Sequence, residues 1–313
     1  MLAYLVRRLL YGFVTVLGVL GLLFVLFFLY AEPIDIARRA LGDKAPQAAL
    51  EQWVHSHGYD RPRLEQLVDH YRSMLTFDFG RSDADGTLLS DRLWRGAGPS
   101  LTVTVPTFVL GVCLGVGLAL FVAYFRETYI DRAGVVICVL AMSVSIVLYI
   151  IGAQYLLGKL LRWFPISGFD PRPELVLRFM ALPWTIGVLA GIGGDVRFYR
   201  TVFLEESSKD YVRTARAKGC GDGRIMLRHV LRNALIPILT HVVVAIPLLF
   251  TGALLTESFF GIPGLGSLTV DAINQNDFSS LRVIVYVGSV LFVLGQLLTD
   301  VAYTLADPRV RLE

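Results

Sequence analysis

The stretch Asp210-Tyr-Val-Arg-Thr-Ala-Arg-Ala-Lys-Gly219 is a basic, helix-forming segment in a chain that is otherwise strongly apolar. With its flanks it forms a polar region of about forty residues, which cannot lie in hydrocarbon because its polar groups would be unsatisfied there. Tyr211–Lys218 contains no helix breaker, Gly219 is a typical helix stop, and a helical pattern resumes at Arg224–Leu231. The segment predicts a helix, a tight turn and a second helix outside the membrane.

The composition of the whole chain indicates an all-α integral membrane protein. Of 313 residues, 55% are hydrophobic and 18% are charged, whereas soluble domains average about 25% charged residues. The net charge of +3 is too small, and the arginines too scattered, to indicate nucleic-acid binding. Cys113, Cys138 and Cys220 show no paired spacing, so neither a disulfide nor a zinc site is predicted.

Six apolar runs reach the length of about 20 residues that a helix needs to cross the hydrocarbon. They are Leu9–Tyr30, Leu101–Phe125, Val135–Gly158, Leu175–Gly194, Leu235–Phe259 and Val283–Ala306. The first run is longer than a signal-peptide core and is interpreted as an uncleaved anchor. Arg178 and Pro183 interrupt the fourth run, which is therefore expected to be a broken span.

The distribution of Lys and Arg predicts the orientation, because short basic connections stay on the inner side of the membrane. Basic residues gather at both ends of the chain, around Arg126, and most densely between Arg197 and Arg232. Both termini are therefore expected inside. The predicted regions are 1–30, the inner N-terminus and first span; 31–99, a long external segment; and 100–313, the core membrane domain with an inner loop at 195–234.

The external segment contains one predicted helix, which starts after Pro62 and has its apolar residues at helical spacing. These residues are Leu64, Leu67, Val68, Tyr71 and Leu75. We expect this face to pack on the membrane domain, while a docking surface for an external protein is the alternative. Nothing in the segment resembles an independent folded domain.

A search for catalytic and ligand-binding motifs gives negative results. The sequence has no phosphate-binding loop, no Gly-x-Ser-x-Gly elbow and no His-Glu-x-x-His zinc motif. No catalytic residue, metal site or cofactor is predicted in this chain. His241 is the only histidine within a predicted span and is expected to bond between helices. Glu257 and Asp300 lie near span ends, where snorkelling or capping would account for them.

The opening stretch, together with Arg228-His-Val-Leu-Arg-Asn-Ala-Leu-Ile-Pro237, resembles the inner-loop signature of binding-protein-dependent ABC importer permeases. The closest branch is the dipeptide, oligopeptide and nickel branch. Arg213-Thr214-Ala215 stands where the broad family has Glu-Ala-Ala, and only Ala215, Gly219 and Leu231 match the broad form. Further resemblances occur at Tyr4–Arg8, Tyr59–Pro62, Phe79–Ser82, Pro263–Gly266, Asp271–Gln275 and Asp307–Arg309. The Pro-Gly-Asp-Pro common in the branch is replaced by Ala31-Glu-Pro-Ile34.

The resemblance implies the type I ABC importer permease fold in the bacterial inner membrane. It implies a short coupling helix that fits a cleft of an ATPase subunit. It also implies an outer gate whose candidates are Pro263, Gly264 and Gly266, and a plain re-entrant turn is the alternative for this segment. The candidate coupling residues are Asp210, Tyr211, Arg213, Thr214, Ala215, Arg216, Ala217, Lys218 and Gly219. The implied partners are a second permease, two ATPase subunits that bind ATP and Mg, an external solute-binding protein and membrane lipid.

The residues of the coupling stretch can be interpreted in two ways without the resemblance. Ala215 and Ala217 would keep the surface low, so that another chain could approach, and Arg213, Arg216 and Lys218 would offer charge to an acidic partner. The alternative is a solvated basic loop that merely obeys the orientation rule. The implied mechanism is alternating access with Gly219 as a hinge. Di- and oligopeptides are the expected substrates, and nickel or another small solute is the alternative.

Two other classes of protein are less consistent with the sequence. A secondary transporter or channel that works without ATP would show an inverted repeat or charged residues at the midplane, and the long external segment of the first half has no counterpart in the second. A membrane-embedded enzyme would need a nucleophile and a base that converge, and none is visible.

Overall fold

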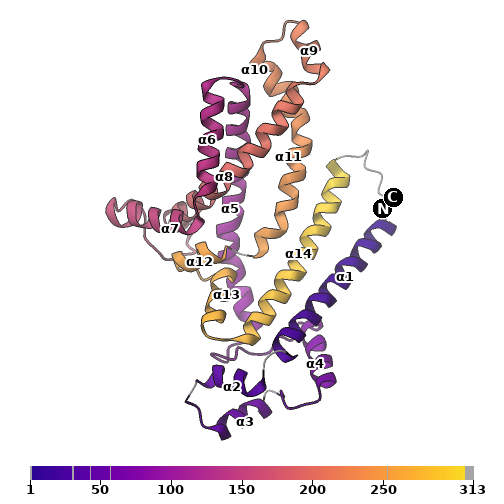
Figure 1. Cartoon of the computed structure of the whole chain (residues 1–313), viewed down its shortest axis with the longest axis vertical. Helices are drawn as coiled ribbons and strands as arrows, with labels where there is room; N and C mark the ends of the chain where they lie inside the picture. The colour runs from indigo at the N-terminus through magenta and orange to yellow at the C-terminus, as the bar shows by residue number, and fades with distance from the viewer. Residues whose placement is uncertain (1, 30–31, 43, 57, 252, 307–313) are drawn as a thin grey trace.

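The computed structural model describes residues 2–29, 32–42, 44–56, 58–251 and 253–306, and these residues are helical nearly throughout (Figure 1). The described residues contain no strand, only an isolated bridge between Arg81 and Leu88. Tyr30, Ala31 and the Asp307–Arg309 motif of the sequence analysis lie outside these ranges. The helices are α1 Leu2–Phe24, α2 Pro33–Leu41, α3 Gln47–Ser56, α4 Arg63–Leu75, α5 Leu89–Tyr124, α6 Tyr129–Ser143, α7 Ile146–Ala153, α8 Pro173–Ser207, α9 Asp210–Ala217, α10 Asp222–Ile225, α11 Leu231–Ala245, α12 Leu254–Phe260, α13 Leu265–Asn274 and α14 Phe278–Ala306.

Four short turns of π- or 3-10 geometry extend or join these helices. They are Val25–Leu29 after α1, Gln154–Leu160 after α7, Met226–Val230 before α11 and Ile246–Thr251 after α11. Within the described residues, five helical stretches are long and apolar enough to cross a membrane. The bent pair of α6 and α7 supplies a sixth if it is counted as one span. The predicted all-α class with six spans is confirmed.

The third and fourth spans differ from the sequence prediction in opposite ways. The predicted continuous helix Val135–Gly158 is wrong, because α6 and α7 meet at an angle of 90°. Val144 has an extended backbone there, and the Ser145 hydroxyl caps the new helix by accepting a hydrogen bond from the Val147 N–H. The predicted break in the fourth span is also wrong. α8 runs unbroken through the buried Pro183 to Ser207, as membrane helices allow when neighbouring helices cover the freed backbone groups.

The fifth span is interrupted, whereas the sequence predicted one helix over Leu235–Phe259. α11 ends at Ala245, and a 3-10 turn leads to the separate helix α12. Pro247 lies at this turn and cannot continue the backbone hydrogen bonds of α11. α14 passes so near that a Cβ on Gly295 would lie 2.8 Å from Pro247. Close packing therefore accompanies the end of α11.

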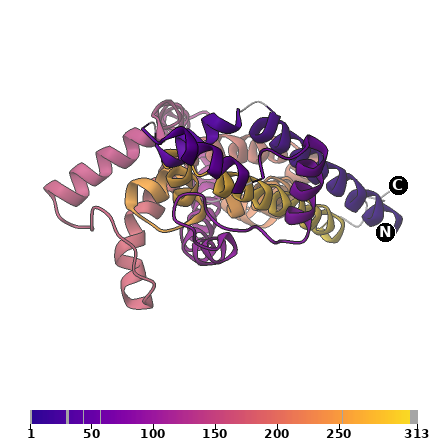
Figure 2. The same cartoon turned by 90° about the horizontal axis from the view of Figure 1, so that it is seen from below.

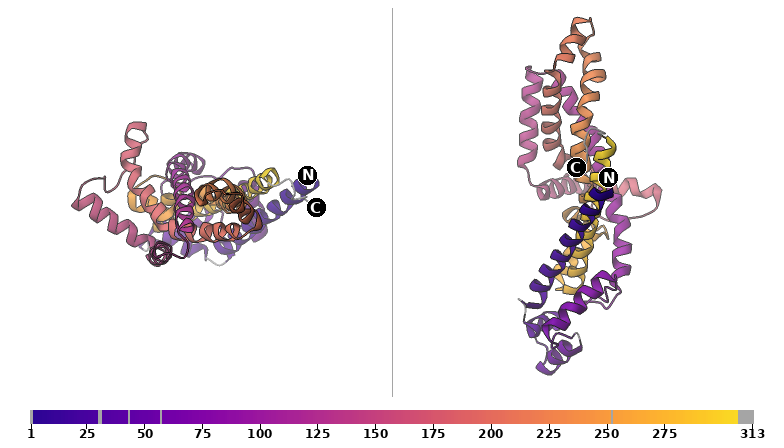
Figure 3. Two further views of the ribbon diagram at one scale, coloured as in Figure 1. Left: turned by 90° about the horizontal axis from the view of Figure 1, so that it is seen from above. Right: turned by 90° about the vertical axis from the view of Figure 1, so that its right-hand side faces the viewer.

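The helices form an elongated bundle whose two ends carry different structures (Figures 1 and 3). α5 and α8 pack along one another, α6 packs on α8, and α1 packs on α14. The turn between α9 and α10 lies at one end of the bundle and α2–α4 lie at the other (Figure 1). This separation agrees with an inner loop and an external segment on opposite sides of the membrane. Seen from below, α7 and the start of α8 project to one side (Figure 2).

Three apolar clusters hold the bundle together. The first joins α5, α6 and α8 to the α9–α11 end, the second joins α1 and α4 to α5 and α14, and the third joins α5, α7, α8 and α12. Much of the remaining helix surface is apolar and exposed, including Leu22, Leu140 and Leu298. Such a surface is suited to lipid or to another membrane chain.

The external helix α4 forms where the sequence predicted it, but the face that it buries is different. Leu64 and Val68 are 77% and 63% exposed, whereas Gln66, His70 and Met74 are buried. The His70 ring lies 3.3 Å from the Leu20 carbonyl oxygen of α1. The predicted packing face is therefore wrong at Leu64, Val68 and Leu75. Tyr71 of that face does contact α1, because its hydroxyl donates to the Leu17 carbonyl.

Candidate functional sites

The coupling stretch folds as a helix, a stop and a second helix, as the sequence predicted. α9 ends at Ala217, and Gly219 has a φ of +80°, which is the left-handed conformation that favours glycine. After this turn α10 leads through Met226–Val230 into α11 without another loop. α9 is thus attached to α8 on one side and, by a short connection, to α11 on the other.

One face of α9 is part of the protein core. Val212 and Ala215 are 2% and 7% exposed and pack with Ile225, Met226 and Val230. The expectation that Ala215 keeps the outer surface low is therefore wrong, because its methyl group faces inward. Ala217 is exposed, and its small side chain would allow another chain to approach.

The opposite face of α9 carries exposed charge. The Arg213 side chain is 78% exposed and lies 3.6 Å from the Asp210 carboxylate. Arg216 Nη2 donates to Asp222 Oδ1 at 2.9 Å, which joins α9 to α10 across the turn. Lys218 is also exposed, directly before the glycine. These cations line a protruding end of the molecule, with the exposed Thr214 between them.

Glu206 at the end of α8 fixes the start of α9, and the sequence analysis missed it. The Tyr211 hydroxyl donates to Glu206 Oε2 at 2.8 Å, and the Lys209 ammonium pairs with the other oxygen. The hydrogen bond to Glu206 raises the pKa of Lys209, so Lys209 is charged at neutral pH. Burial raises the pKa of Tyr211, which keeps its phenol protonated as the donor.

A cavity of about 270 Å³ separates α9 and α10 from the inner end of α5. Tyr124 and Arg126 line it from the α5 side, and Val212, Arg216 and Asp222 line it from the α9 side. Packing between the turn and α5 is therefore incomplete. Among the helices, α9 packs mainly on α10.

The outer-gate candidates lie in the turn between α12 and α13, around a buried carboxylate. Glu257 is fully buried and accepts hydrogen bonds from the Gly266 N–H at 2.7 Å and the Ser267 N–H at 3.2 Å. It also accepts from the Ala253 N–H at 2.9 Å and the Ser100 hydroxyl of α5 at 2.8 Å. Snorkelling of Glu257 is thus wrong, and its alternative, capping, is confirmed at the start of α13.

Gly264 and Gly266 lie so close to the Glu257 carboxylate that no larger residue would fit at either position. A Cβ on Gly264 would lie 2.2 Å from Glu257 Oε2, and one on Gly266 would lie 2.8 Å from the Leu254 backbone. Pro263 is exposed, whereas Gly264 and Gly266 are buried. The structure brings all three together at the start of α13, where Gly264 is the N-cap and Gly266 lies in the first turn of the helix.

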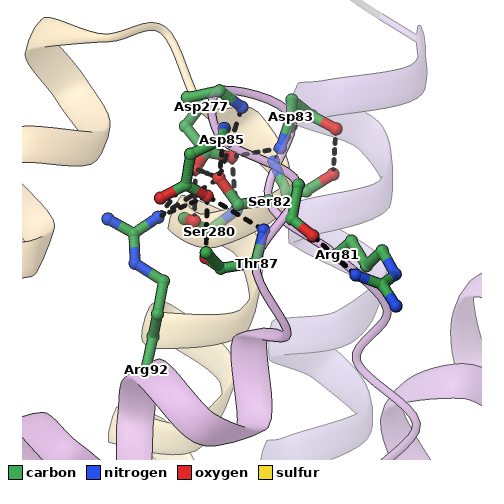
Figure 4. A network of polar contacts seen from close by, with 11 residues as sticks. Arg81, Ser82, Asp83, Asp85, Thr87, Arg92, Asp277 and Ser280 are labelled. Carbon is green, nitrogen blue, oxygen red and sulfur yellow. Dashed lines mark hydrogen bonds and ion pairs between the residues drawn. The ribbon is translucent and has the colours of Figure 1, made fainter.

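A second buried carboxylate, Asp277, attaches the external segment to the start of α14 (Figure 4). Asp277 is 1% exposed and accepts from the hydroxyls of Ser82 and Ser280, each at 2.5 Å. Arg92 of α5 lies 3.5 Å from the same carboxylate. Three separate parts of the chain therefore meet at one acidic side chain.

The loop that holds Ser82 is ordered by further acidic residues of the same network (Figure 4). The Ser279 N–H and hydroxyl donate to Asp83 at 3.0 and 2.8 Å. Hydrogen bonds from Thr87 lower the pKa of Asp85 to about 2, so this carboxylate is ionised at neutral pH. Phe79–Ser82 was predicted as a turn and matches the family resemblance, whereas Asp277 was not predicted.

His241 contacts another helix, as predicted. Its Nε2 lies 3.5 Å from Asp195 Oδ1 of α8, and its ring stacks on Phe198 at 4.4 Å between centroids. Asp300 pairs with Arg8 of α1 at 3.2 Å, an ion pair that the sequence did not predict.

Comparison with known proteins now decides the family. Residues 111–312 match the family described as binding-protein-dependent transport system inner membrane component. Residues 1–85 match the family described as the N-terminal part of a binding-protein-dependent transport system membrane component. The chain belongs to the binding-protein-dependent permeases. It is a multi-pass protein of the bacterial inner membrane.

Curated relatives place this permease in the peptide branch of the ABC permeases. It is 31% identical over 313 residues to a probable peptide ABC transporter permease of Sinorhizobium fredii, covering 98% of this chain and 99% of the relative. It is 33% identical over 288 residues to a putative peptide transport system permease of Brucella abortus, covering 90% of each chain. It is 30% identical over 319 residues to the glutathione transport system permease of Escherichia coli, covering 99% of each.

Within the described residues, the permease has no group of three or more His, Cys, Asp or Glu side chains arranged to hold a metal ion. Glu206, Asp195 and Asp277 were not predicted as functional residues. Asp195 and Asp277 are contacted by the distant His241 and Ser82, whereas Glu206 is contacted by its neighbours Lys209 and Tyr211. A signal was available for Glu257, which precedes two closely spaced glycines in an apolar region.

Proposed function

We propose that this chain is a translocation subunit of an ATP-driven importer for di- and oligopeptides. In this proposal it pairs with a second permease, two ATPase subunits bind the inner face, and an external solute-binding protein delivers the peptide. ATP and Mg are bound by the ATPase subunits, and this chain performs no hydrolysis itself.

The observation that carries the proposal is the two-sided character of α9. One face of α9 is buried in the core through Val212 and Ala215. On the opposite face, the exposed Arg213 lies beside Asp210, where it could meet an acidic surface. Glu206 holds its start on α8, and the short α10 links its end to α11. A displacement of α9 would therefore be transmitted to two spans at once, as alternating access requires.

The outer side supports a gate that moves as a unit. Glu257 joins α12, the following turn and α13 to Ser100 of α5 through four hydrogen bonds. Movement of α5 or α12 would carry the Pro263–Gly266 turn with it. In this proposal the turn closes the outer mouth while the inner side is open.

Short peptides are the proposed substrates because of the relatives. Two of the relatives described above are named as peptide permeases, and the Escherichia coli relative is named as a glutathione permease. Glutathione is itself a small peptide, so these names favour one class of substrate.

The proposal is tested by extracting the chain in a mild detergent from its native membrane. We expect an ATPase to co-purify, and its hydrolysis to rise when a peptide-loaded binding protein is added. The same preparation, reconstituted in vesicles, should import peptide only with ATP. Peptide flux through the purified chain alone would instead support an ATP-independent transporter and overturn the proposal.

A further inference from the structure

Four acidic side chains of the membrane domain differ in how completely they are neutralised. Asp131 of α6 accepts two hydrogen bonds from Arg200, at 2.7 and 2.8 Å, and Asp300 pairs with Arg8. Glu257 accepts four hydrogen bonds, as described above. A carboxylate at membrane depth is costly unless it is paired in one of these ways.

Asp195 on α8 is the exception among these four. Its ion-pair contact in the described residues is with His241, which bears a positive charge only when protonated. The 3.5 Å separation of Asp195 Oδ1 and His241 Nε2 is long compared with about 2.7–2.9 Å for a charge-assisted hydrogen bond. About a third of the Asp195 side chain remains exposed. This carboxylate therefore has unused capacity to accept hydrogen bonds.

The Asp195 carboxylate lies at a cavity of about 170 Å³ that is formed where α5, α8 and α11 meet. Thr107 and Gly111 of α5 and Gly187 and Gly191 of α8 are among its lining residues. A Cβ on Gly111 or Gly191 would meet nothing within 4 Å, so these glycines leave space that side chains would fill. The volume is that of about one amino-acid residue rather than of a whole drug-sized ligand, for which about 300 Å³ is a lower limit.

The imidazole of His241 is held in a fixed position at this cavity. It stacks on Phe198 and meets the ring of the buried Tyr199 edge-on at 5.6 Å between centroids. Its Nε2 is therefore kept near one side of the Asp195 carboxylate. The remaining side is available to a second donor.

We propose that Asp195 binds the α-ammonium group of the peptide as it passes through the membrane domain, with His241 positioning the carboxylate. This inference rests on the proposed import of peptides and names the group that the permease itself recognises. An ammonium group offers the positive charge and the N–H donors that Asp195 lacks. The cavity has room for the terminal residue that carries this ammonium group.

The test compares Asp195→Asn with Asp195→Glu in the complete transporter, reconstituted in vesicles with its solute-binding protein at saturating concentration. The probes are di-, tri- and tetra-alanine, all with a free amino terminus. Asn removes the charge at nearly constant size, whereas Glu keeps the charge. Asp91→Asn, an exposed position at the outer start of α5, is the control for loss of one carboxylate elsewhere.

We expect Asp195→Asn to lower kcat/KM for import by roughly 10- to 100-fold, as loss of a charge-assisted hydrogen bond predicts. Asp195→Glu should restore most of the import, and Asp91→Asn should match the wild type. Import by Asp195→Asn within about twofold of the wild type would overturn the inference.

A second measurement separates binding from a structural role. The amount of assembled complex is determined for each variant by size-exclusion chromatography. If both Asp195 variants fail to assemble, or if Glu impairs import as severely as Asn, the pair merely ties α8 to α11 and the inference is wrong. If the wild type imports none of the alanine peptides, it is the proposed peptide import that fails, and the inference falls with it.

Discussion

Gly219 is the residue at which the coupling helix changes direction. Its φ of +80° lies in a region that costs other residues roughly 1–2 kcal/mol, and β-branched residues are the least suited to it. Nothing lies within 4 Å of a Cβ built on Gly219, so the constraint is in the backbone and not in the packing. A substitution at Gly219 should therefore act through the backbone conformation and not through a steric clash.

We predict that Gly219→Val leaves membrane insertion intact but uncouples import from ATP hydrolysis. The valine forces the turn out of the left-handed conformation, so α9 no longer holds its angle to α10. Peptide uptake and ATPase activity are measured together in vesicles. Gly221→Val is the matched control, because Gly221 has a φ of −67° and an equally open Cβ position. Unchanged uptake in Gly219→Val would contradict the prediction.

Single residues also mark the limit of what the sequence can predict. Gly219 could be identified because a helix stop is a local property. Glu257 could be predicted to cap a helix but not to be fully buried, because one donor to its carboxylate is the distant Ser100. Burial of an acid depends on all of its donors, and no local pattern contains this one.

At the level of elements, a glycine allows α8 to approach α6 closely, because it has no side chain. A Cβ on Gly193 would lie 2.7 Å from the Cys138 carbonyl oxygen and 2.9 Å from Met142 Cγ. The carbonyl belongs to the α6 backbone and cannot move aside as a side chain could. The spacing of the two helices thus depends on this one residue.

We predict that Gly193→Val destabilises the permease by about 1–3 kcal/mol, the usual cost of overpacking. Its neighbour gives the control, since a Cβ on Gly194 would meet nothing within 4 Å. The melting temperatures of the purified variants in detergent are compared. Gly193→Val should melt clearly below Gly194→Val, and equal melting temperatures would show that α6 can shift at no cost.

The elements also show where sequence patterns mislead. The 90° bend between α6 and α7 occurs in an apolar run without proline or glycine at the break, so hydropathy predicts a straight span. Pro183 has the opposite effect, since it predicts a break that α8 does not have. Hydropathy located the spans well, because it measures depth in the membrane. It contains no information on how helices bend against their neighbours.

At the level of the whole molecule, the external segment is attached to the bundle at two separate sites. His70 and Tyr71 of α4 contact the backbone carbonyls of α1, and Ser82 contacts Asp277 before α14. Burial lowers the pKa of His70 to about 4, and the Arg282 guanidinium contributes to this shift. His70 is therefore neutral in the folded protein over most of the acid range.

We predict that acid loosens this attachment between about pH 6.5 and pH 4. Unfolded His70 takes up a proton near pH 6.5, but folded His70 does so only near pH 4, so stability is lost as the pH falls through this window and changes no further from this cause below it. Hydrogen exchange of α4 amides, corrected for intrinsic rates, measures the loss. His70→Gln, which can still donate to Leu20, should remove the dependence; the same slope in both proteins would contradict it.

The contact between Ser82 and Asp277 also has a consequence for biosynthesis. Its partners are separated by 195 positions in the chain, and translation at about 5–20 residues per second adds them on the order of 10–40 s apart. During this interval the external segment has crossed the membrane, yet the acceptor for its serine has not been synthesised. The loop can close only when the last span emerges, so the nascent permease completes its outer face at the end of translation.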